Sequence, residues 1–437
     1  MHTLEDLRAG RLAGLRRLDL SAGLTDFPPE IFALADSLEI LNLSGNKLTA
    51  LPADLPQLHR LHTLFCSNNA FTAVPEVLGQ CPQLQMVGFK ANQIRVLPAA
   101  ALPPRLRWLI LTDNELEHLP NEIGRCTQLQ KLMLAGNQLT SLPTSLASCT
   151  QLALLRLAAN QLSSLPPWLL ELPQLAWLAY AGNPLAASAE AAPGTYSPLP
   201  AVPWEELVVQ EQLGEGASGV IYRATWQRPA ASSATDVAVK LFKGAITSDG
   251  LPHCEMLACL RAGQHPNLVA VEGKISQHPA EAEGLVLALI APEFSNMAGP
   301  PSLASCTRDV YAPGTAYSPA AAVRIAHGIA SAVAHLHHQG ILHGDLYAHN
   351  MLNTSAGNCL LTDFGAASFF EPATAEALAL QRLEARAFGC LLEELLAHCP
   401  VATEATVALA ALQQRCLGPV AGRPSFAEIA PEIARFL

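Results

Sequence analysis

The sequence predicts an α/β solenoid of short repeats, followed by a separate α+β domain. Three observations support this prediction. An asparagine recurs every 23 residues, with one step of 22, at Asn46, Asn69, Asn92, Asn114, Asn137, Asn160 and Asn183. A segment rich in proline and small residues, 186–203, then ends the periodicity. From Trp204 onward, apolar runs of strand length alternate with helical patterns, which indicates a mixed domain.

Each repeat has the pattern L-x-x-L-x-L-x-x-N-x-L, and the segment from Leu38 to Leu48 is the cleanest copy. An earlier copy begins at Leu15 and has Gly23 in place of the asparagine. The pattern resembles the leucine-rich repeat, with eight units over residues 1–185. The resemblance implies short parallel strands that bury their leucines by stacking. We expect each repeated asparagine to bond backbone groups at the turn that leaves its strand.

The concave face of such an array carries the side chains that alternate with the buried leucines. Here these positions include large apolar residues, which are unusual for a solvated surface and favour binding of a protein partner. The alternative is that the rings only pack across neighbouring repeats. The predicted partner-binding residues are Phe65, Trp108, Ile110, Met133 and Trp177.

Composition narrows the choice of partners and compartment. The net charge is -11, with 37 acidic and 26 basic residues, so nucleic acid and anionic membranes are poor partners. The N-terminus lacks a signal-peptide pattern and no apolar run approaches the length of a membrane span, so we expect a cytoplasmic protein. Cys81, Cys126 and Cys149 each precede a repeat leucine by three residues, which predicts buried packing rather than disulfides.

The domain organisation follows from these breaks. We expect the repeat domain at 1–185, a semi-rigid linker at 186–203, and the second domain at 204–437.

The stretch 341–365 of the second domain carries the clearest chemical signal. Asp345 follows His343 by two residues, Asn350 follows Asp345 by five, and Asp363 opens an Asp-Phe-Gly. Short apolar runs flank these residues, which predicts a loop between buried strands. Phosphoryl transfer uses such a set, because one carboxylate orients the attacking hydroxyl while an amide and a second carboxylate hold metal ions.

This stretch resembles the protein-kinase pattern H-R-D-L-x-x-x-N followed by D-F-G. The resemblance implies a two-lobed α+β fold, ATP and Mg²⁺ as cofactors, Asp345 as the catalytic carboxylate, and Asn350 and Asp363 as metal ligands. Val237-Ala238-Val239-Lys240 matches the V-A-I-K motif, so Lys240 would bind phosphates and pair with Glu255 on the helical segment 254–262. A zinc site built from the nearby histidines is rejected, because no cysteine or carboxylate completes its spacing.

A glycine-rich segment upstream resembles the kinase phosphate loop. A dinucleotide-binding fold carries a similar G-x-G-x-x-G, but there a helix follows, whereas strand-like residues follow here, so a hairpin is predicted. The predicted nucleotide-binding residues of this segment are Leu213, Gly214, Glu215, Gly216, Ala217, Ser218, Gly219, Val220 and Ile221.

Four departures from the kinase pattern limit the functional prediction. Gly344 replaces the arginine of H-R-D, so control by phosphorylation of the activation loop is doubtful. Tyr347 stands where the serine/threonine family usually has lysine. Only 21 residues separate Asp363 from Glu384, with no A-P-E between them, and Arg423 therefore lacks its usual glutamate partner.

The sequence favours a leucine-rich repeat protein kinase, serine/threonine-specific, whose repeats bind a protein partner. Two alternatives stay open. One is a non-catalytic pseudokinase scaffold, although all five chemical residues are present. The other is a small-molecule phosphotransferase, a class that shares H-G-D-L-x-x-x-N and lacks A-P-E.

Overall fold

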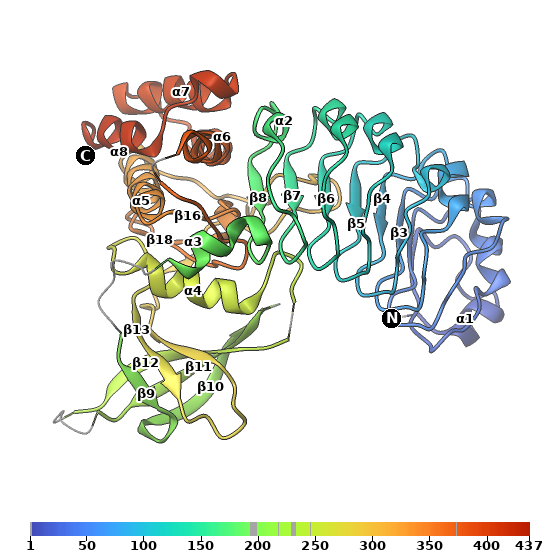
Figure 1. Ribbon diagram of the computed structural model, residues 1–437, viewed down its shortest axis with the longest axis horizontal. Helices are drawn as coiled ribbons and strands as arrows, with labels where there is room; N and C mark the ends of the chain where they lie inside the picture. Colours follow the sequence, from blue (N-terminus) through green and yellow to red (C-terminus); the bar gives the residue numbers. More distant parts are fainter. Residues whose placement is uncertain (1, 193–198, 217, 229–232, 245, 373) are drawn as a thin grey trace. The chain divides into compact units, whose positions relative to one another are not determined.

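The computed structural model describes residues 2–192, 199–216, 218–228, 233–244, 246–372 and 374–437 (Figure 1). The chain divides into two compact units. The first comprises Met1–Leu175 with Asn183–Leu185, and the second comprises Ala176–Gly182 with Ala186–Leu437. The boundaries expected from the sequence at 185 and 203 stay predictions.

The first unit is a parallel sheet of three-residue strands, one per repeat. Neighbouring strands pair in chain order with matching register, so that Leu41 faces Leu64 and Leu109 faces Leu132. The central residue of each strand is buried, as the repeat pattern predicts. The strands are β1 (Arg17–Asp19), β2 (Ile40–Asn42), β3 (Thr63–Phe65), β4 (Met86–Gly88), β5 (Trp108–Ile110), β6 (Lys131–Met133) and β7 (Leu154–Arg156).

Short helical turns return the chain from each strand to the next, on the side of the sheet away from the strands' free face (Figure 1). Many begin directly after a proline, which stands in an extended conformation at the N-cap and has its φ fixed by its ring. They are α1 (Leu4–Arg8), η1 (Pro29–Leu34), η2 (Leu55–Gln57), η3 (Glu76–Gln80), η4 (Ala99–Ala101), η5 (Asn121–Arg125), η6 (Thr144–Ser148) and α2 (Pro167–Leu170).

The repeated asparagines bond the backbone, as predicted. Asn137 is 6% exposed; its amide nitrogen donates to the carbonyls of Leu111 (2.8 Å) and Leu134 (3.0 Å), and its amide oxygen accepts from the N–H of Leu116 (3.0 Å). Each asparagine therefore ties its own turn to the preceding repeat. The predicted cysteine packing is also confirmed, since Cys81, Cys126 and Cys149 are buried free thiols.

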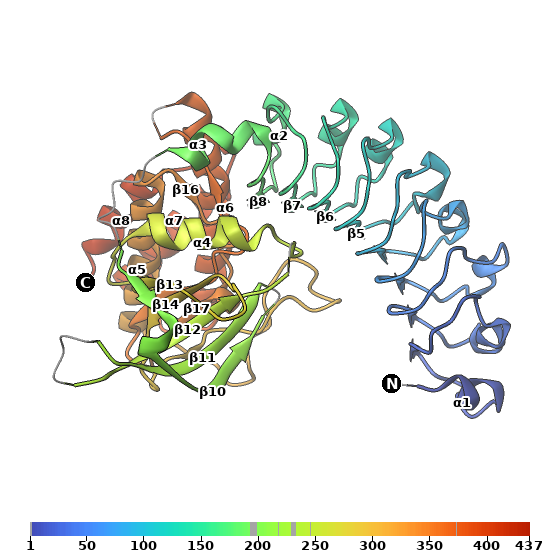
Figure 2. The same ribbon diagram turned by 60° about the horizontal axis from the view of Figure 1, so that its bottom comes forward.

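The second unit begins with a six-stranded sheet in the order β10-β11-β12-β14-β13-β9. Its core is built from β-branched and aromatic residues such as Val237, Val239, Val286 and Trp226. Helix α4 (Pro252–Ala262) packs on this sheet through Met256, and Figures 1 and 2 show it alongside. The strands are β9 (Ala201–Pro203), β10 (Leu207–Glu215), β11 (Gly219–Trp226), β12 (Thr235–Phe242), β13 (Val271–Ser276) and β14 (Gly284–Ala288), with the turn η8 (Trp204–Glu206) before β10.

The rest of the second unit is mostly helical. Helix α5 (Pro319–His338) buries the predicted apolar face of Ile325, Ile329, Val333 and Leu336, each 0% exposed. The other helices are α6 (Ala375–Ala397), α7 (Glu404–Leu417), η10 (Val420–Gly422) and α8 (Phe426–Ala434). Two small sheets carry the predicted loop: β15 (Ser295–Asn296), β17 (Met351–Asn353) and β18 (Cys359–Leu361) form one, and β16 (Ile341–Leu342) and β19 (Ser368–Phe369) form the other.

The predicted fold class is confirmed: a repeat solenoid is followed by an α+β domain with a strand-rich and a helix-rich part. The segment expected to be a linker differs from a plain tether. Its described residues form helix α3 (Ala187–Ala191), preceded by the turn η7 (Pro184–Ala186), and strand β9, which extends the sheet beside β13. Apolar Val202 is 0% exposed in that sheet, which explains why the chain is ordered there. Residues 193–198 of the expected linker lie outside the described residues.

Candidate active site

Lys240 and Glu255 form a buried ion pair between the sheet and helix α4. Their side chains are 14% and 1% exposed. Burial alone lowers the pKa of Lys240, but the carboxylates of Glu255 and Asp363 outweigh it and raise the pKa, so the amine stays protonated. The predicted pairing of strand lysine and helix glutamate is thus present in the structure.

The glycine-rich segment forms the predicted hairpin, because β10 and β11 pair antiparallel across it. Its glycines differ in their surroundings. A Cβ on Gly219 would lie 2.4 Å from the carbonyl oxygen of Leu241, whereas a Cβ on Gly214 or Gly216 would meet no atom within 4 Å. Close packing therefore requires Gly219, while Gly214 and Gly216 leave open space at the hairpin. Ala217, also predicted to bind nucleotide, lies outside the described residues.

The other predicted residues of the hairpin differ in exposure and contacts. Leu213 is 50% exposed, which is unusual for leucine, and Glu215 forms an exposed ion pair with Lys243. Ser218 is almost buried, and its hydroxyl lowers the pKa of Glu255 against the larger upward effect of burial. Val220 and Ile221 lie on β11 and face Leu241 and Lys240 on β12, so they belong to the strand that pairs with the one carrying the lysine.

Asp345 and Asn350 are joined within the loop that follows β16. The amide nitrogen of Asn350 donates to Oδ2 of Asp345 at 2.7 Å and to its backbone oxygen at 3.0 Å. His343, 0% exposed, supports the same loop: its Nε2 contacts the carbonyl of Thr362 at 3.0 Å, and its Nδ1 accepts from the N–H of Asp345 at 3.3 Å. This histidine therefore holds the loop.

Asp363 follows β18 and adopts a left-handed backbone conformation with φ of 58°. Such a conformation is rare for a residue other than glycine and is typical of functional sites. A Cβ built on Gly365 would lie 3.0 Å from Oδ1 of Asp363 and 3.9 Å from Oε2 of Glu255, so both carboxylates border that glycine. The structure thus brings the Lys240–Glu255 pair and Asp363 together.

Oxygen donors at this site fit a magnesium ion. Asn350 uses its amide nitrogen for both bonds to Asp345, which leaves its amide oxygen for a cation, and the Asp363 carboxylate is the other ligand type that magnesium prefers. The open space at Gly214 and Gly216 likewise fits a phosphate group that approaches the backbone closely. The side chains present are therefore compatible with a magnesium nucleotide.

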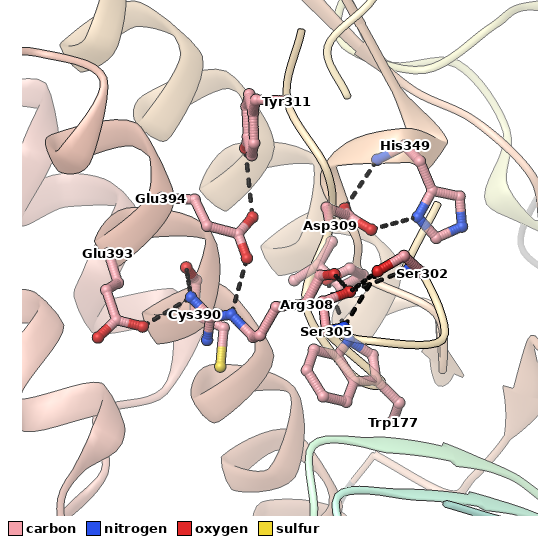
Figure 3. A network of polar contacts seen from close by, with 11 residues as sticks. Trp177, Ser302, Ser305, Arg308, Asp309, Tyr311, His349, Cys390, Glu393 and Glu394 are labelled. Atoms are coloured by element: carbon pink, nitrogen blue, oxygen red, sulfur yellow. Dashed lines mark hydrogen bonds and ion pairs between the residues drawn. The ribbon is translucent and has the colours of Figure 1, made fainter. Parts of the chain in front are cut away.

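The loop after β16, residues 343–350, is called the catalytic loop here after the kinase motif that it resembles. A residue that the sequence did not single out, Asp309, anchors the end of this loop (Figure 3). Its side chain is 0% exposed and accepts from the backbone N–H of His349 at 3.0 Å and contacts the ring Nδ1 at 2.7 Å. Burial lowers the pKa of His349, but Asp309, together with the charges of Asp345 and Asp363, raises it overall. No motif marks Asp309, because 40 residues separate it from His349.

The segment that carries Asp309 is itself tied to helix α6. Arg308 donates to Glu393 at 2.6 Å and to Glu394 at 2.9 Å, and Tyr311 donates to Glu394 at 3.2 Å (Figure 3). The chain between β15 and α5 therefore connects the catalytic loop to the helical part.

Glu384 lies on α6, and Arg423 follows η10 and reaches α6 through the carbonyl of Arg382. Glu384 is 1% exposed, accepts from the N–H of Gly344 at 2.6 Å, and contacts Nε2 of His337 at 2.7 Å. Arg423, which lacks the expected glutamate, donates to the carbonyls of Gly418 and Arg382 instead. Burial lowers its pKa to about 10.

The candidate partner-binding residues divide into two groups. Phe65, Trp108, Ile110 and Met133 are partly exposed, and some pack across repeats, since the Trp108 indole N–H lies 3.4 Å from the Met133 sulfur. Trp177 is 2% exposed and lies inside the second unit, so the expectation that it belongs to an exposed binding face is wrong. The repeat pattern could not predict the burial of Trp177, because its ring contacts Leu346, which is 169 residues away in the sequence.

In fold class, the protein is thus a repeat solenoid followed by an α+β domain. Comparison with known families specifies both parts. Residues 207–384 match the family described as protein tyrosine and serine/threonine kinase, and residues 104–162 and 37–58 match leucine rich repeat families. The chain therefore carries leucine-rich repeats followed by a protein kinase domain.

Curated relatives cover only parts of this chain. It is 37% identical over 92 residues to PH domain leucine-rich repeat-containing protein phosphatase 1 of Homo sapiens, covering 21% of this chain and 5% of that protein. It is 30% identical over 181 residues to serine/threonine-protein kinase mos of Gallus gallus, covering 39% and 50%. It is 33% identical over 123 residues to the probable inactive serine/threonine-protein kinase roco10 of Dictyostelium discoideum, covering 27% and 5%.

Among the residues that the structure describes, none of the helices is both long and apolar enough to cross a bilayer.

Proposed function

We propose that the protein is an ATP-dependent protein kinase that transfers the γ-phosphate to a serine or threonine hydroxyl of a protein substrate. The observation that carries the proposal is the Lys240–Glu255 ion pair, which borders the same glycine as the Asp363 carboxylate. Burying the charge of a lysine costs desolvation free energy even when the lysine is paired. The buried Lys240 therefore favours a binding role for this charge. A pairing of this kind suits the phosphates of a nucleotide.

Each residue then has a distinct task. Gly214 and Gly216 admit the phosphates to the backbone of the hairpin, and Lys240 binds them while Glu255 orients its amine. Asp363 and Asn350 would hold magnesium, which supplies charge neutralisation at the phosphates when bound. Asp345, oriented by the Asn350 amide, accepts a hydrogen bond from the substrate hydroxyl and aligns it for in-line attack.

Nucleotide binding can be tested separately from turnover. ATP affinity is measured by calorimetry with and without magnesium for the parent, Lys240→Ala and Asp363→Asn. We expect Lys240→Ala to weaken binding in both conditions and Asp363→Asn to remove the magnesium dependence. Binding that is equal in all three proteins would exclude these assignments.

The repeats are proposed to recruit a protein partner, which brings a substrate to a kinase whose segment between Asp363 and Glu384 is short. The partly exposed residues Phe65, Trp108, Ile110 and Met133 are the proposed contacts. Aromatic and methionine side chains are enriched at the centres of protein interfaces. We propose a cytoplasmic location for this activity.

Recruitment is tested by placing charge on the proposed face. Phe65→Arg and Ile110→Arg should lower phosphorylation of the natural substrate while leaving autophosphorylation unchanged. The matched control is Gln138→Arg, an exposed position outside the proposed contacts. Equal phosphorylation of the natural substrate by the parent and both face variants would contradict the proposed surface.

A further inference from the structure

The strand of the eighth repeat, β8 (Trp177–Ala179), packs against the catalytic loop within the second unit. The Trp177 ring stacks on Tyr347, with centroids 4.1 Å apart and planes 7° from parallel. The indole N–H also donates to the carbonyl oxygen of Leu346 at 3.2 Å. These two residues directly follow Asp345, so Trp177 fixes the backbone that positions the candidate catalytic carboxylate.

Gly344 shows how closely this strand approaches. Its φ is 74°, and a Cβ there would lie 2.5 Å from the carbonyl oxygen of Ala366 and 2.7 Å from that of Leu178. A side chain at this position would collide with the backbone on both sides. The glycine that replaces the arginine of H-R-D is therefore required by the approach of Ala366 and β8 together.

The next residue of the repeat, Tyr180, holds the chain after Asp-Phe-Gly. It is 1% exposed; its backbone N–H donates to the Ser368 hydroxyl at 2.8 Å, and its own hydroxyl donates to the carbonyl oxygen of Phe369 at 3.1 Å. Ser368 and Phe369 form β19, which pairs with β16 directly before the catalytic loop. The strands on both sides of the candidate site are thus fixed by one segment.

Helix α3 extends the same support to helix α4, which carries Glu255. Arg261, near the end of α4, donates to the carbonyls of Ala189 (2.6 Å), Glu190 (2.8 Å) and Ala192 (2.9 Å). Its guanidinium also lies over the Phe369 ring, 4.5 Å from the centroid. Within the segment, the Glu190 carboxylate accepts from the N–H of Gly182 at 2.7 Å, which joins its two parts.

We propose that residues 176–182 and 186–192 form a brace that holds the catalytic loop, the chain after Asp-Phe-Gly and helix α4 in one arrangement. The brace replaces support that a longer activation segment would give, so positioning is built into the chain and needs no phosphorylation. Trp177, Tyr180 and Arg261 are positioning residues, because they act through the backbone of other segments. The expected effect of the brace on turnover rests on the proposed function, whereas its effect on the order of the three segments that it contacts does not.

Amide hydrogen exchange of the full chain tests the brace without requiring activity. Peptides from 341–350, 366–371 and 252–262 are compared among the parent, Trp177→Ala, Trp177→Phe and Tyr180→Phe. Trp168→Ala is the matched control, since this half-buried tryptophan lies on α2 of the same repeat, outside the brace. Exchange reports local opening of the segments that the brace contacts.

Trp177→Ala should speed exchange in 344–350 by about tenfold or more. Trp177→Phe should fall between it and the parent, because phenylalanine keeps the stacking on Tyr347 and loses only the N–H bond. Tyr180→Phe should act mainly on 366–371. Parent-like exchange in all three variants, or an equal effect of Trp168→Ala on 344–350, would overturn the proposal.

Steady-state kinetics provide a second test of the brace. Trp177→Ala should lower kcat on the order of tenfold to a hundredfold and change KM for ATP less than about twofold, because Trp177 does not contact the nucleotide residues. If the parent transfers no phosphate, the proposed function fails, and the exchange experiment still decides whether the brace exists. If the parent is active and Trp177→Ala keeps its kcat, the positioning role is wrong.

Discussion

Glu384 on helix α6 accepts a hydrogen bond from the backbone N–H of Gly344 at 2.6 Å, which anchors the catalytic loop from the side of the helical part. The same carboxylate contacts Nε2 of His337 on α5 at 2.7 Å. All these groups are buried, so removing the carboxylate leaves unpaired polar atoms inside the domain.

Glu384→Ala should therefore destabilise the kinase domain by about 2–5 kcal/mol. Glu384→Gln should cost less, because its amide oxygen still accepts from Gly344. Chemical denaturation measures both. Glu393→Ala, at a position 53% exposed on the same helix, is the control and should change stability by less than about 1 kcal/mol. Parent-like stability of Glu384→Ala would contradict the anchoring role.

Alanine variants of the two kinds of glycine in the hairpin should have opposite effects on stability and on ATP affinity. Gly219→Ala should lower stability by about 1–3 kcal/mol, because its Cβ meets the Leu241 carbonyl. Gly216→Ala should leave stability unchanged or slightly higher, since the space there is open. Its Cβ would occupy phosphate space, so ATP affinity should fall on the order of tenfold. Thermal melting and ATP titration separate the two effects; a Gly216→Ala protein with parent affinity would place the phosphates elsewhere.

The asparagine ladder should dominate the stability of the repeats. Asn137→Ala removes three hydrogen bonds from buried backbone groups and should cost about 2–4 kcal/mol. The neighbouring exposed Gln138→Ala should change stability by less than about 0.5 kcal/mol. The midpoint of urea unfolding, followed by circular dichroism, measures the difference. Similar midpoints for the two variants would refute the structural role of Asn137.

Glu394 gives the domain a specific pH dependence. Burial, opposed by Arg308 and reinforced by the charge of Asp309, raises its pKa from 4.5 to about 7 overall. A carboxyl whose pKa is raised in the folded state binds its proton more tightly there than in the unfolded chain. Its contribution to stability is therefore complete below pH 4.5 and is lost as the pH rises through about 7.

Stability should thus fall by up to about 3 kcal/mol between pH 5 and pH 8 through this group. Glu394→Gln should remove most of that slope, whereas Glu393→Gln should retain it. Denaturant midpoints across this pH range provide the measurement. An unchanged slope in Glu394→Gln would show that another group titrates.

The sequence predicted those features that depend on short-range patterns. Leucine and asparagine periodicity was enough for the repeat strands and the bonds of Asn137, and strand-like residues after Gly219 were enough for the hairpin. The pairing of Lys240 with Glu255 came from a motif and is present in the structure. The order of the segment 186–203 was missed, because α3 and β9 are stabilised by Arg261 and Val202 in tertiary contacts.

The errors at the site share one cause. Trp177 fits the periodicity of the exposed face, yet its ring stacks on Tyr347, which no spacing rule indicates. Asp309 likewise carries no motif and reaches His349 only through the fold. Gly344 was recognised as a departure from H-R-D. The reason why glycine is needed there, the approach of the Ala366 and Leu178 carbonyls, exists only in three dimensions.

The proposed function requires that this protein transfers the γ-phosphate of ATP to protein. The decisive experiment incubates the parent, Asp345→Asn and Asp363→Asn with magnesium and ATP labelled at the γ-phosphate and maps the labelled residues. We expect label on serine or threonine in the parent, almost none in Asp345→Asn despite retained ATP binding, and none in Asp363→Asn. Equal labelling of the parent and Asp345→Asn, or no labelling of a parent that binds ATP, would contradict it.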